Sequence, residues 1–197
     1  MIVTKDELLK SKKTVQTLLK EKVFIYPTDS IYGLGCDATS EKLVQKIRYI
    51  KKSNLQPFSV IVPSKEWVYQ NCEVGPEQKK YVEKLGKKLM VNGEEHCFTL
   101  VLKLNNKDAV ARNVCQGLET IGVRIPNHWF SEVVANLGVP VVTTSANQTG
   151  EDFMTSIEDL SSGIRREVDL IVYEGEKKGY PSIIIHAERK TKEVKIR

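Results

Sequence analysis

The chain has 197 residues, of which 41% are hydrophobic and 28% charged, and no apolar run approaches the roughly 20 residues that span a bilayer. This composition excludes a disordered chain, a collagen, a coiled-coil rod and an integral membrane protein. The net charge of +5 favours anionic partners such as nucleotides, phosphates or RNA, although a lysine-rich surface accounts for it equally well. The first residues lack the apolar stretch of a signal peptide, so we expect a cytoplasmic protein.

Capping and breaking residues predict the helices in chain order. Helices are expected to begin near Thr4, Ser40 and Pro76, and a further helix is expected to end at Gly138. Short apolar runs predict strands at 23–26, 58–62, 98–104, 120–125, 141–144, 170–173, 182–186 and 193–196. Helices alternate with strands in the first two thirds, and strands cluster at the end. We therefore expect one α/β domain over residues 1–197 with a mixed sheet.

The familiar signatures of nucleotide, hydrolase and metal sites are absent from the sequence. It has no phosphate-binding loop of the G-x-x-x-x-G-K-[ST] type, no G-x-S-x-G elbow and no H-E-x-x-H. The four cysteines include no C-x-x-C pair. We expect reduced thiols and no metal site built by the protein alone.

A polar segment, YPTDSIYGLGCD, runs from Tyr26 to Asp37 directly after a predicted buried strand. Hydroxyls, a carboxylate and two glycines at a strand end suit a place where the backbone approaches a ligand closely. A tight turn with capping side chains would have the same residues. Both interpretations stay open at this point.

Two further segments carry small donors or positive charge at predicted element ends. The run PVVTTSAN, from Pro140 to Asn147, brings neutral donors that suit phosphate or carboxylate oxygens, or that bond their own turn. Lys51 and Lys52 lie just past a predicted helix, and Arg124 ends a predicted strand. Ligands of open α/β sheets bind beyond the carboxyl ends of strands, so convergence of these segments would make an anion-binding cleft.

These segments together resemble the YrdC-like family of threonylcarbamoyl-AMP synthases. The resemblance is carried by YPTDSIYGLGCDA, GVRIP, VPVVTTSAN and a late YPSIII, in the family's order from about Val23 to Arg197. It implies an open twisted mixed sheet flanked by helices, with a deep basic cavity, in the short single-domain form. It also implies an enzyme that condenses L-threonine, bicarbonate and ATP into threonylcarbamoyl-AMP and pyrophosphate. Mg²⁺ bound with ATP would be its cofactor, and a tRNA threonylcarbamoyl transferase complex would use its product.

The resemblance also assigns roles to individual side chains. The residues it implies for threonine binding are Thr28, Arg124, Thr143 and Ser182. The residues it implies for ATP binding are Lys51, Lys52, Thr99, Ser145, Asn147 and Arg197. Lys51 would be the catalytic residue among them.

The chain departs from the family's pattern in three places. The stretch KKSNLQPF, residues 51–58, lacks the arginine of the family's K-x-R element, so Lys52 is expected to replace it as a point charge. Glu95-His96-Cys97 replaces a proline-glycine-proline run before Thr99, and Ile183 replaces a threonine. These departures keep open a divergent paralogue that binds tRNA, double-stranded RNA or a ribosome precursor as an accessory protein. A generic nucleotide hydrolase is disfavoured because a phosphate loop is missing.

Overall fold

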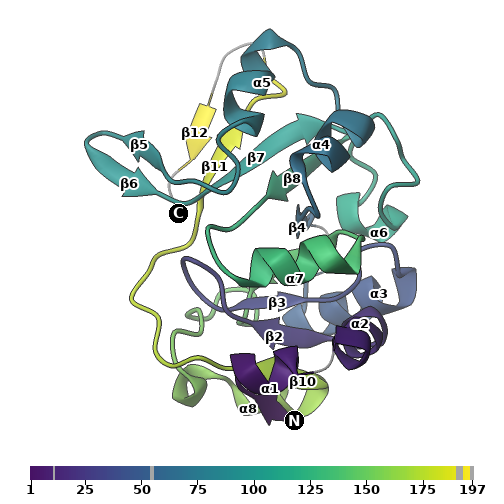
Figure 1. Cartoon of the computed structure of the whole chain (residues 1–197), viewed down its shortest axis with the longest axis vertical. Coiled ribbons are helices and arrows are strands. Elements are labelled where there is room, and N and C mark those ends of the chain that lie inside the picture. The colour runs from purple at the N-terminus through teal and green to yellow at the C-terminus, as the bar shows by residue number, and fades with distance from the viewer. Residues whose placement is uncertain (11, 54–55, 190–192, 196–197) are drawn as a thin grey trace.

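The computed structural model describes residues 1–10, 12–53, 56–189 and 193–195 (Figure 1). In this part of the chain, ten strands form one sheet in the order β1-β10-β2-β3-β9-β4-β8-β7-β11-β12, and β5 and β6 form a separate hairpin. The strands are β1 Ile2–Val3, β2 Phe24–Tyr26, β3 Gly33–Gly35, β4 Ser59–Ile61, β5 Leu89–Val91, β6 Glu94–His96, β7 Phe98–Lys103, β8 Thr120–Arg124, β9 Val141–Ser145, β10 Leu170–Val172, β11 Ile183–His186 and β12 Glu193–Lys195.

Helices lie on both faces of the sheet, with α7 in front of it and α3 behind it in the view of Figure 1. The helices are α1 Lys5–Leu9, α2 Lys12–Glu21, α3 Glu41–Lys51, α4 Lys65–Asn71, α5 Pro76–Val82, α6 Arg112–Cys115, α7 Phe130–Leu137 and α8 Ser162–Glu167, with a 3₁₀ turn at Ile157–Asp159. Parallel pairs such as β4 with β8 occur beside antiparallel pairs such as β7 with β8. The predicted mixed α/β class is therefore confirmed.

Two apolar clusters fill the space between the sheet and its helices. Strand β2 contributes to both, because alternate side chains of a strand point to opposite faces. Phe24 and Tyr26 pack with α7, whereas Ile25 packs with α3 in the larger cluster. The alternation repeats in β4, where Val60 and Ile61 belong to different clusters. The sheet is thus buried on both faces over its central strands.

Two elements differ from the sequence-based expectation. The helix expected after Thr4 is found as two helices, α1 and α2, although Leu8 and Leu19 are buried in the same cluster. The glycines after Tyr26, expected either at a close approach to a ligand or in a tight turn, form strand β3. A Cβ atom on Gly33 would lie 2.8 Å from Cζ of Tyr26, and one on Gly35 would lie 2.4 Å from a backbone oxygen of β9. The close approach that these glycines allow is therefore to the Tyr26 ring and β9.

Helix α3 is fixed at both ends, which matters because it carries Lys51. Ser40 Oγ accepts a hydrogen bond from the Leu43 amide at its start, and the helix ends at Lys52 in the left-handed conformation, with φ of 51°. Arg48 is buried in the last turn and donates to the backbone oxygens of Asn113 and Gln56, both at 2.9 Å. These bonds fasten the end of α3 to two neighbouring segments.

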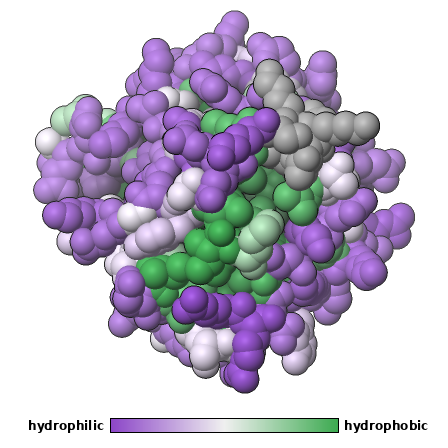
Figure 2. All heavy atoms as spheres, turned by 60° about the horizontal axis from the view of Figure 1, so that its bottom comes forward, coloured by the Kyte–Doolittle hydropathy of each residue, from purple (hydrophilic) through white to green (hydrophobic). Residues whose placement is uncertain are grey.

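A long connection, residues 173–182, runs from β10 to β11 along the left side of Figure 1 and joins distant parts of the sheet. Figure 2 shows an apolar area on the end of the molecule that lies at the bottom of Figure 1. Met1, Ile2 and Leu9, at the start of the chain and in α1, are among the exposed large hydrophobic residues. Among the described helices, none is long and apolar enough to cross a membrane.

Candidate functional site

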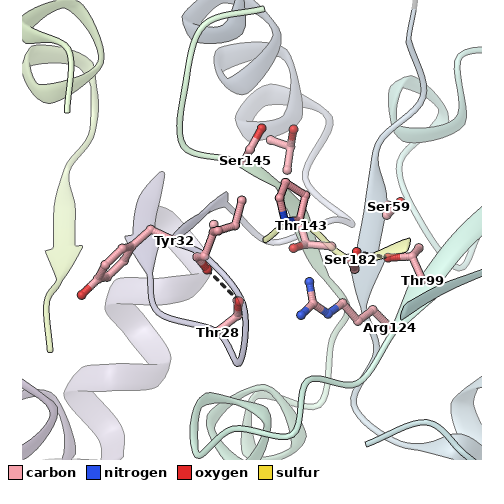
Figure 3. Close-up of a pocket in the computed structure, with 12 residues that line it drawn as sticks. Thr28, Tyr32, Ser59, Thr99, Arg124, Thr143, Ser145 and Ser182 are labelled. Atoms are coloured by element: carbon pink, nitrogen blue, oxygen red, sulfur yellow. Dashed lines mark hydrogen bonds between the residues drawn. The ribbon is translucent and has the colours of Figure 1, made fainter. Parts of the chain in front are cut away.

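Six of the ten side chains expected to bind substrates line one cavity of about 130 Å³ (Figure 3). They come from the β2–β3 turn, β7, β8, β9 and the start of β11, which are far apart in the sequence. Hydroxyl groups dominate the lining, and among the described lining residues Arg124 alone carries a formal charge. The lining residues are Thr28, Ile31, Tyr32, Gly33, Ser59, Thr99, Arg124, Thr143, Thr144, Ser145, Pro181 and Ser182.

Thr28 both stabilises a tight turn and lines the cavity, so both interpretations of the YPTDSIYGLGCD segment apply to it. Its Oγ1 donates to the backbone oxygen of Ile31 at 2.7 Å, the bond drawn in Figure 3, and accepts from the amide of Ser30 at 3.1 Å. The hydroxyl thus closes its own turn, as Ser and Thr commonly do. The same buried side chain also lines the cavity.

Arg124 is the buried cation of the cavity, at 6% exposure. Its Nη2 pairs with the carboxylate of Asp29 and donates to Ser30 Oγ at 3.0 Å. Its Nε is buried and has no hydrogen-bond partner among the described residues. A guanidinium with an unused donor, surrounded by neutral hydroxyls, is suited to bind a carboxylate or phosphate.

Ser59 also lines the cavity, although the sequence analysis did not predict it as a site residue. The register of three strands explains its position. Ser59 in β4 lies opposite Gly122 of β8 on one side and Thr143 of β9 on the other. A Cβ on Gly122 would lie only 2.4 Å from Ser59 Oγ, so a larger residue there would displace the Ser59 hydroxyl. Thr99 Oγ1 lies 2.9 Å from Ser182 Oγ in a buried hydroxyl pair nearby. The sequence signal that could have identified Ser59 is its position as the one polar residue in the apolar run FSVIV, residues 58–62.

Lys51 lies beside the cavity lining and holds the Ser145–Asn147 loop. Its buried Nζ donates to the backbone oxygens of Ser145 and Asn147, both at 2.7 Å, and to Asn147 Oδ1 at 2.9 Å. Ser145 Oγ also donates to Asn147 Oδ1, at 2.5 Å. The expected residues Lys51, Ser145 and Asn147 are therefore brought together in one hydrogen-bonded group, of which Ser145 lines the cavity.

Lys52 is not brought to this group. Lys52 is exposed and lines a separate open hollow of about 920 Å³, between the end of α3, the loop at 148–151 and α8. Two adjacent lysines thus face different surroundings, because α3 ends between them in a left-handed turn. Arg197 lies outside the described residues, so its expected contact with ATP stays a prediction.

Burial keeps two weakly acidic groups near the cavity, Tyr32 and Cys97, in their neutral forms. Desolvation raises the pKa of the Tyr32 hydroxyl to about 12. Burial also raises the pKa of the Cys97 thiol to about 11, beside the backbone oxygen of Asp29. The described residues contain no group of three or more His, Cys, Asp or Glu side chains that could hold a metal ion. The site is thus built for binding and positioning anionic groups rather than for nucleophilic attack by a side chain.

This fold and cavity define a member of the Sua5/YciO/YrdC family. The family's model, described as telomere recombination, matches residues 16–197. The chain belongs to that family, as its motifs predicted.

Curated relatives include proteins with and without a stated activity. A putative threonylcarbamoyl-AMP synthase of Methanocaldococcus jannaschii is 31% identical over 186 residues, which cover 90% of this chain and 82% of the relative. A threonylcarbamoyl-AMP synthase of Hydrogenovibrio crunogenus is 27% identical, over 77% of this chain and 79% of its own. The uncharacterized protein YciO of Escherichia coli K12 is also 27% identical, over 88% of this chain and 81% of its own.

Solved structures show the same fold at lower identity. P. abyssi Sua5 complexed with L-threonine superposes with a TM-score of 0.82 and 24% identity, over 98% of this chain. This chain spans 56% of that protein. E. coli YciO superposes with a TM-score of 0.77 and 21% identity, over 98% of this chain and 92% of its own. These likenesses confirm the large mixed sheet with flanking helices.

Proposed function

We propose that this chain is a threonylcarbamoyl-AMP synthase, which condenses L-threonine, bicarbonate and ATP and releases pyrophosphate. The observation that carries the proposal is the buried Arg124 guanidinium with an unpartnered Nε in a hydroxyl-lined cavity. Two relatives named for this activity and the threonine complex of P. abyssi Sua5 support it. The activity makes the chain a nucleotidyltransferase of the tRNA-modification machinery.

The cavity suits the amino-acid substrate. Arg124 would take the α-carboxylate of L-threonine, because charge-assisted bonds to a buried guanidinium are strong and directional. Thr28, Thr143 and Ser182 line the same cavity and can bond the ammonium or hydroxyl group.

The Lys51 group suits the nucleotide. Lys51 places a positive charge behind Ser145 and Asn147, so this loop can receive ATP phosphates. Thr99 would lie near the nucleotide, and Arg197 is a further candidate. Mg²⁺ is proposed to arrive with ATP, since phosphates and water commonly supply most of its ligands.

The reaction asks little covalent chemistry of the protein. The amine of threonine attacks the carbon of bicarbonate to give a carbamate with loss of water. A carbamate oxygen then attacks the α-phosphorus of ATP, the bond to the bridging oxygen breaks, and pyrophosphate leaves. The chain would contribute positioning and neutralisation of negative charge. A tRNA threonylcarbamoyl transferase complex in the cytoplasm would consume the adenylate.

The test is pyrophosphate release with labelled bicarbonate, and detection of the labelled adenylate. We expect release to require L-threonine and bicarbonate together, to fall sharply in Arg124→Gln, and to persist in Arg112→Gln. Arg112 is an exposed arginine of α6 and serves as the matched control. Equal release with ATP alone would indicate a hydrolase instead. No turnover together with tight, salt-sensitive RNA binding would indicate the accessory RNA-binding protein.

A further inference from the structure

Asp29 is a buried acid beside the proposed amino-acid site that none of the assigned roles uses. It lies in the turn between β2 and β3, next to Thr28. Its side chain is 8% exposed and that of its partner Arg124 is 7% exposed. A carboxylate so deeply buried requires strong partners, and each of its oxygens has one.

The two oxygens of Asp29 join separate segments of the chain. Oδ1 pairs with Arg124 Nη2, at the end of β8. Oδ2 accepts a hydrogen bond from the amide of Asn127 at 2.7 Å, three residues further along. The carboxylate therefore holds both the guanidinium and the backbone that follows its strand.

The contacts of Arg124 determine which of its donors remain for a ligand. Nη2 carries two hydrogens, and Asp29 and Ser30 Oγ take one each. Nε has no partner among the described residues. In Figure 3 the Arg124 side chain reaches from β8 toward the middle of the labelled hydroxyl groups. Pairing on one nitrogen thus fixes the plane of the guanidinium while other donors remain unused.

We propose that Asp29 is the positioning residue of the amino-acid site. Its carboxylate sets the orientation of Arg124, which then binds the α-carboxylate of the substrate. This inference rests on the proposed function, because it assumes that Arg124 receives a substrate carboxylate. It gives Asp29 no contact with the substrate.

The physical reason is preorganisation. A long arginine side chain loses substantial rotamer entropy when it is fixed, and Asp29 makes that loss occur during folding rather than on binding. The negative charge of Asp29 also compensates the buried positive charge of Arg124. An unpaired guanidinium at this position would lower the stability of the folded protein. Removing the charge of Asp29 frees Arg124 to turn toward other acceptors, so the site would need to be ordered by the ligand itself.

The test is the affinity for L-threonine and for ATP in Asp29→Asn, measured by calorimetry. The amide keeps the size of the side chain, but it has one accepting oxygen for the two donors. We expect the Kd for L-threonine to rise about tenfold and the Kd for ATP to stay within about twofold of the parent. In the Arg124→Gln background, Asp29→Asn should cause no further loss, because a positioning residue acts only through its partner. Unchanged threonine affinity, or fully additive losses in the double variant, would overturn the proposal.

Asp37→Asn is the matched control. Asp37 is a similarly buried aspartate, at 8% exposure, whose Oδ1 accepts from the amide of Thr39 at 2.8 Å. It is not part of the cavity lining, and we expect parental affinity for both ligands. A threonine loss in Asp37→Asn equal to that in Asp29→Asn would show a general effect on folding and overturn the assignment.

A second variant covers the case in which Asp29→Asn does not fold. Asp29→Glu keeps the charge and moves it by one methylene group, and we expect a rise of roughly threefold in the Kd for L-threonine with ATP unaffected. Parental threonine affinity in Asp29→Glu would then overturn the proposal. Failure of the parent protein itself to bind L-threonine would instead contradict the proposed function on which it rests.

Discussion

At the scale of single residues, the hydroxyl groups of the site serve both local structure and the cavity. The Thr28 hydroxyl donates to the backbone oxygen of Ile31 within its turn, and the same side chain lines the cavity. The turn and the ligand-site interpretations of this segment are therefore compatible. Residue types were predictable from sequence, but the direction of a side chain was not. Lys51 and Lys52 are neighbours, yet one is buried against the Ser145–Asn147 loop and the other is exposed.

Replacing each lysine by methionine tests this difference. Lys51→Met leaves three oxygen acceptors of the Ser145–Asn147 loop without their donor, at a cost of about 1–3 kcal/mol for an unsatisfied buried group. We expect adenylate formation to be lost and the melting temperature to fall. Lys52→Met removes an exposed charge outside the cavity, so we expect turnover within about twofold of the parent. The measurements are pyrophosphate release and thermal melting of both variants.

Each variant is the matched control for the other, since both substitutions remove one positive charge and keep an unbranched apolar side chain. Equal turnover of the two would contradict the arrangement described for α3. A large loss in Lys52→Met alone would instead favour the role that the family's pattern predicted for it, as a substitute for the missing arginine.

At the scale of elements, the sequence predicted the strands and longer helices because their apolar spacing is local. It missed short elements such as α4 and α6, and it missed β3, whose glycines are explained only by contact with Tyr26 and β9. The β10–β11 connection, residues 173–182, gave a sequence signal only at its end, where the YPSIII motif begins at Tyr180. Glu174 holds it in place by accepting from Trp129 Nε1 at 2.6 Å and pairing with His128 and Lys177.

This connection should loosen in acid. Burial by itself would raise the pKa of Glu174, but hydrogen bonds from Lys177, Trp129 and His128 outweigh it and hold that pKa below its ordinary value. Burial lowers the pKa of His128 below its ordinary value despite the attraction of Glu174. For both groups the folded pKa is lower than the unfolded one, so their stabilisation is full above the unfolded pKa and is lost as pH falls through the folded pKa. The loss begins near pH 6.5 for His128 and near pH 4.3 for Glu174.

Hydrogen exchange measures this loosening. The amide of Glu174 donates to the Tyr32 hydroxyl at 3.1 Å, and the amide of Lys177 donates to the backbone oxygen of Thr155 at 2.9 Å. We expect the protection factors of both amides to fall between pH 7 and pH 4, while those in β7 and β8 stay high. Glu174→Gln should lower the protection at pH 7. Protection that is constant over this pH range would show that the contacts of Glu174 do not hold the connection.

At the scale of the whole molecule, the cavity depends on the order of strands in the sheet. Thr28 and Ser182 are separated by most of the chain, and β9, β4, β8, β7 and β11 are successive neighbours that bring their lining residues together. No local pattern specifies that order, which is why the motifs predicted Arg124 and Thr143 but not the placement of Ser59 between their strands. A ligand in the cavity would therefore add a link between segments that the sheet, the Asp29–Arg124 pair and the Thr99–Ser182 hydroxyl pair already hold together.

We expect L-threonine to raise the melting temperature of the whole chain as a consequence. A ligand that binds only the folded state at about 100 times its Kd stabilises it by about 2.7 kcal/mol. In a domain of this size each kcal/mol shifts the melting temperature by about 2–4 °C, so the expected rise is about 5–10 °C. Arg124→Gln should abolish the rise, and Arg112→Gln should keep it, since only Arg124 is proposed to bind the carboxylate of the ligand. A parent protein stabilised by ATP but not by L-threonine would show that the cavity does not hold the amino acid, because linkage requires any ligand bound to the folded state to raise its stability.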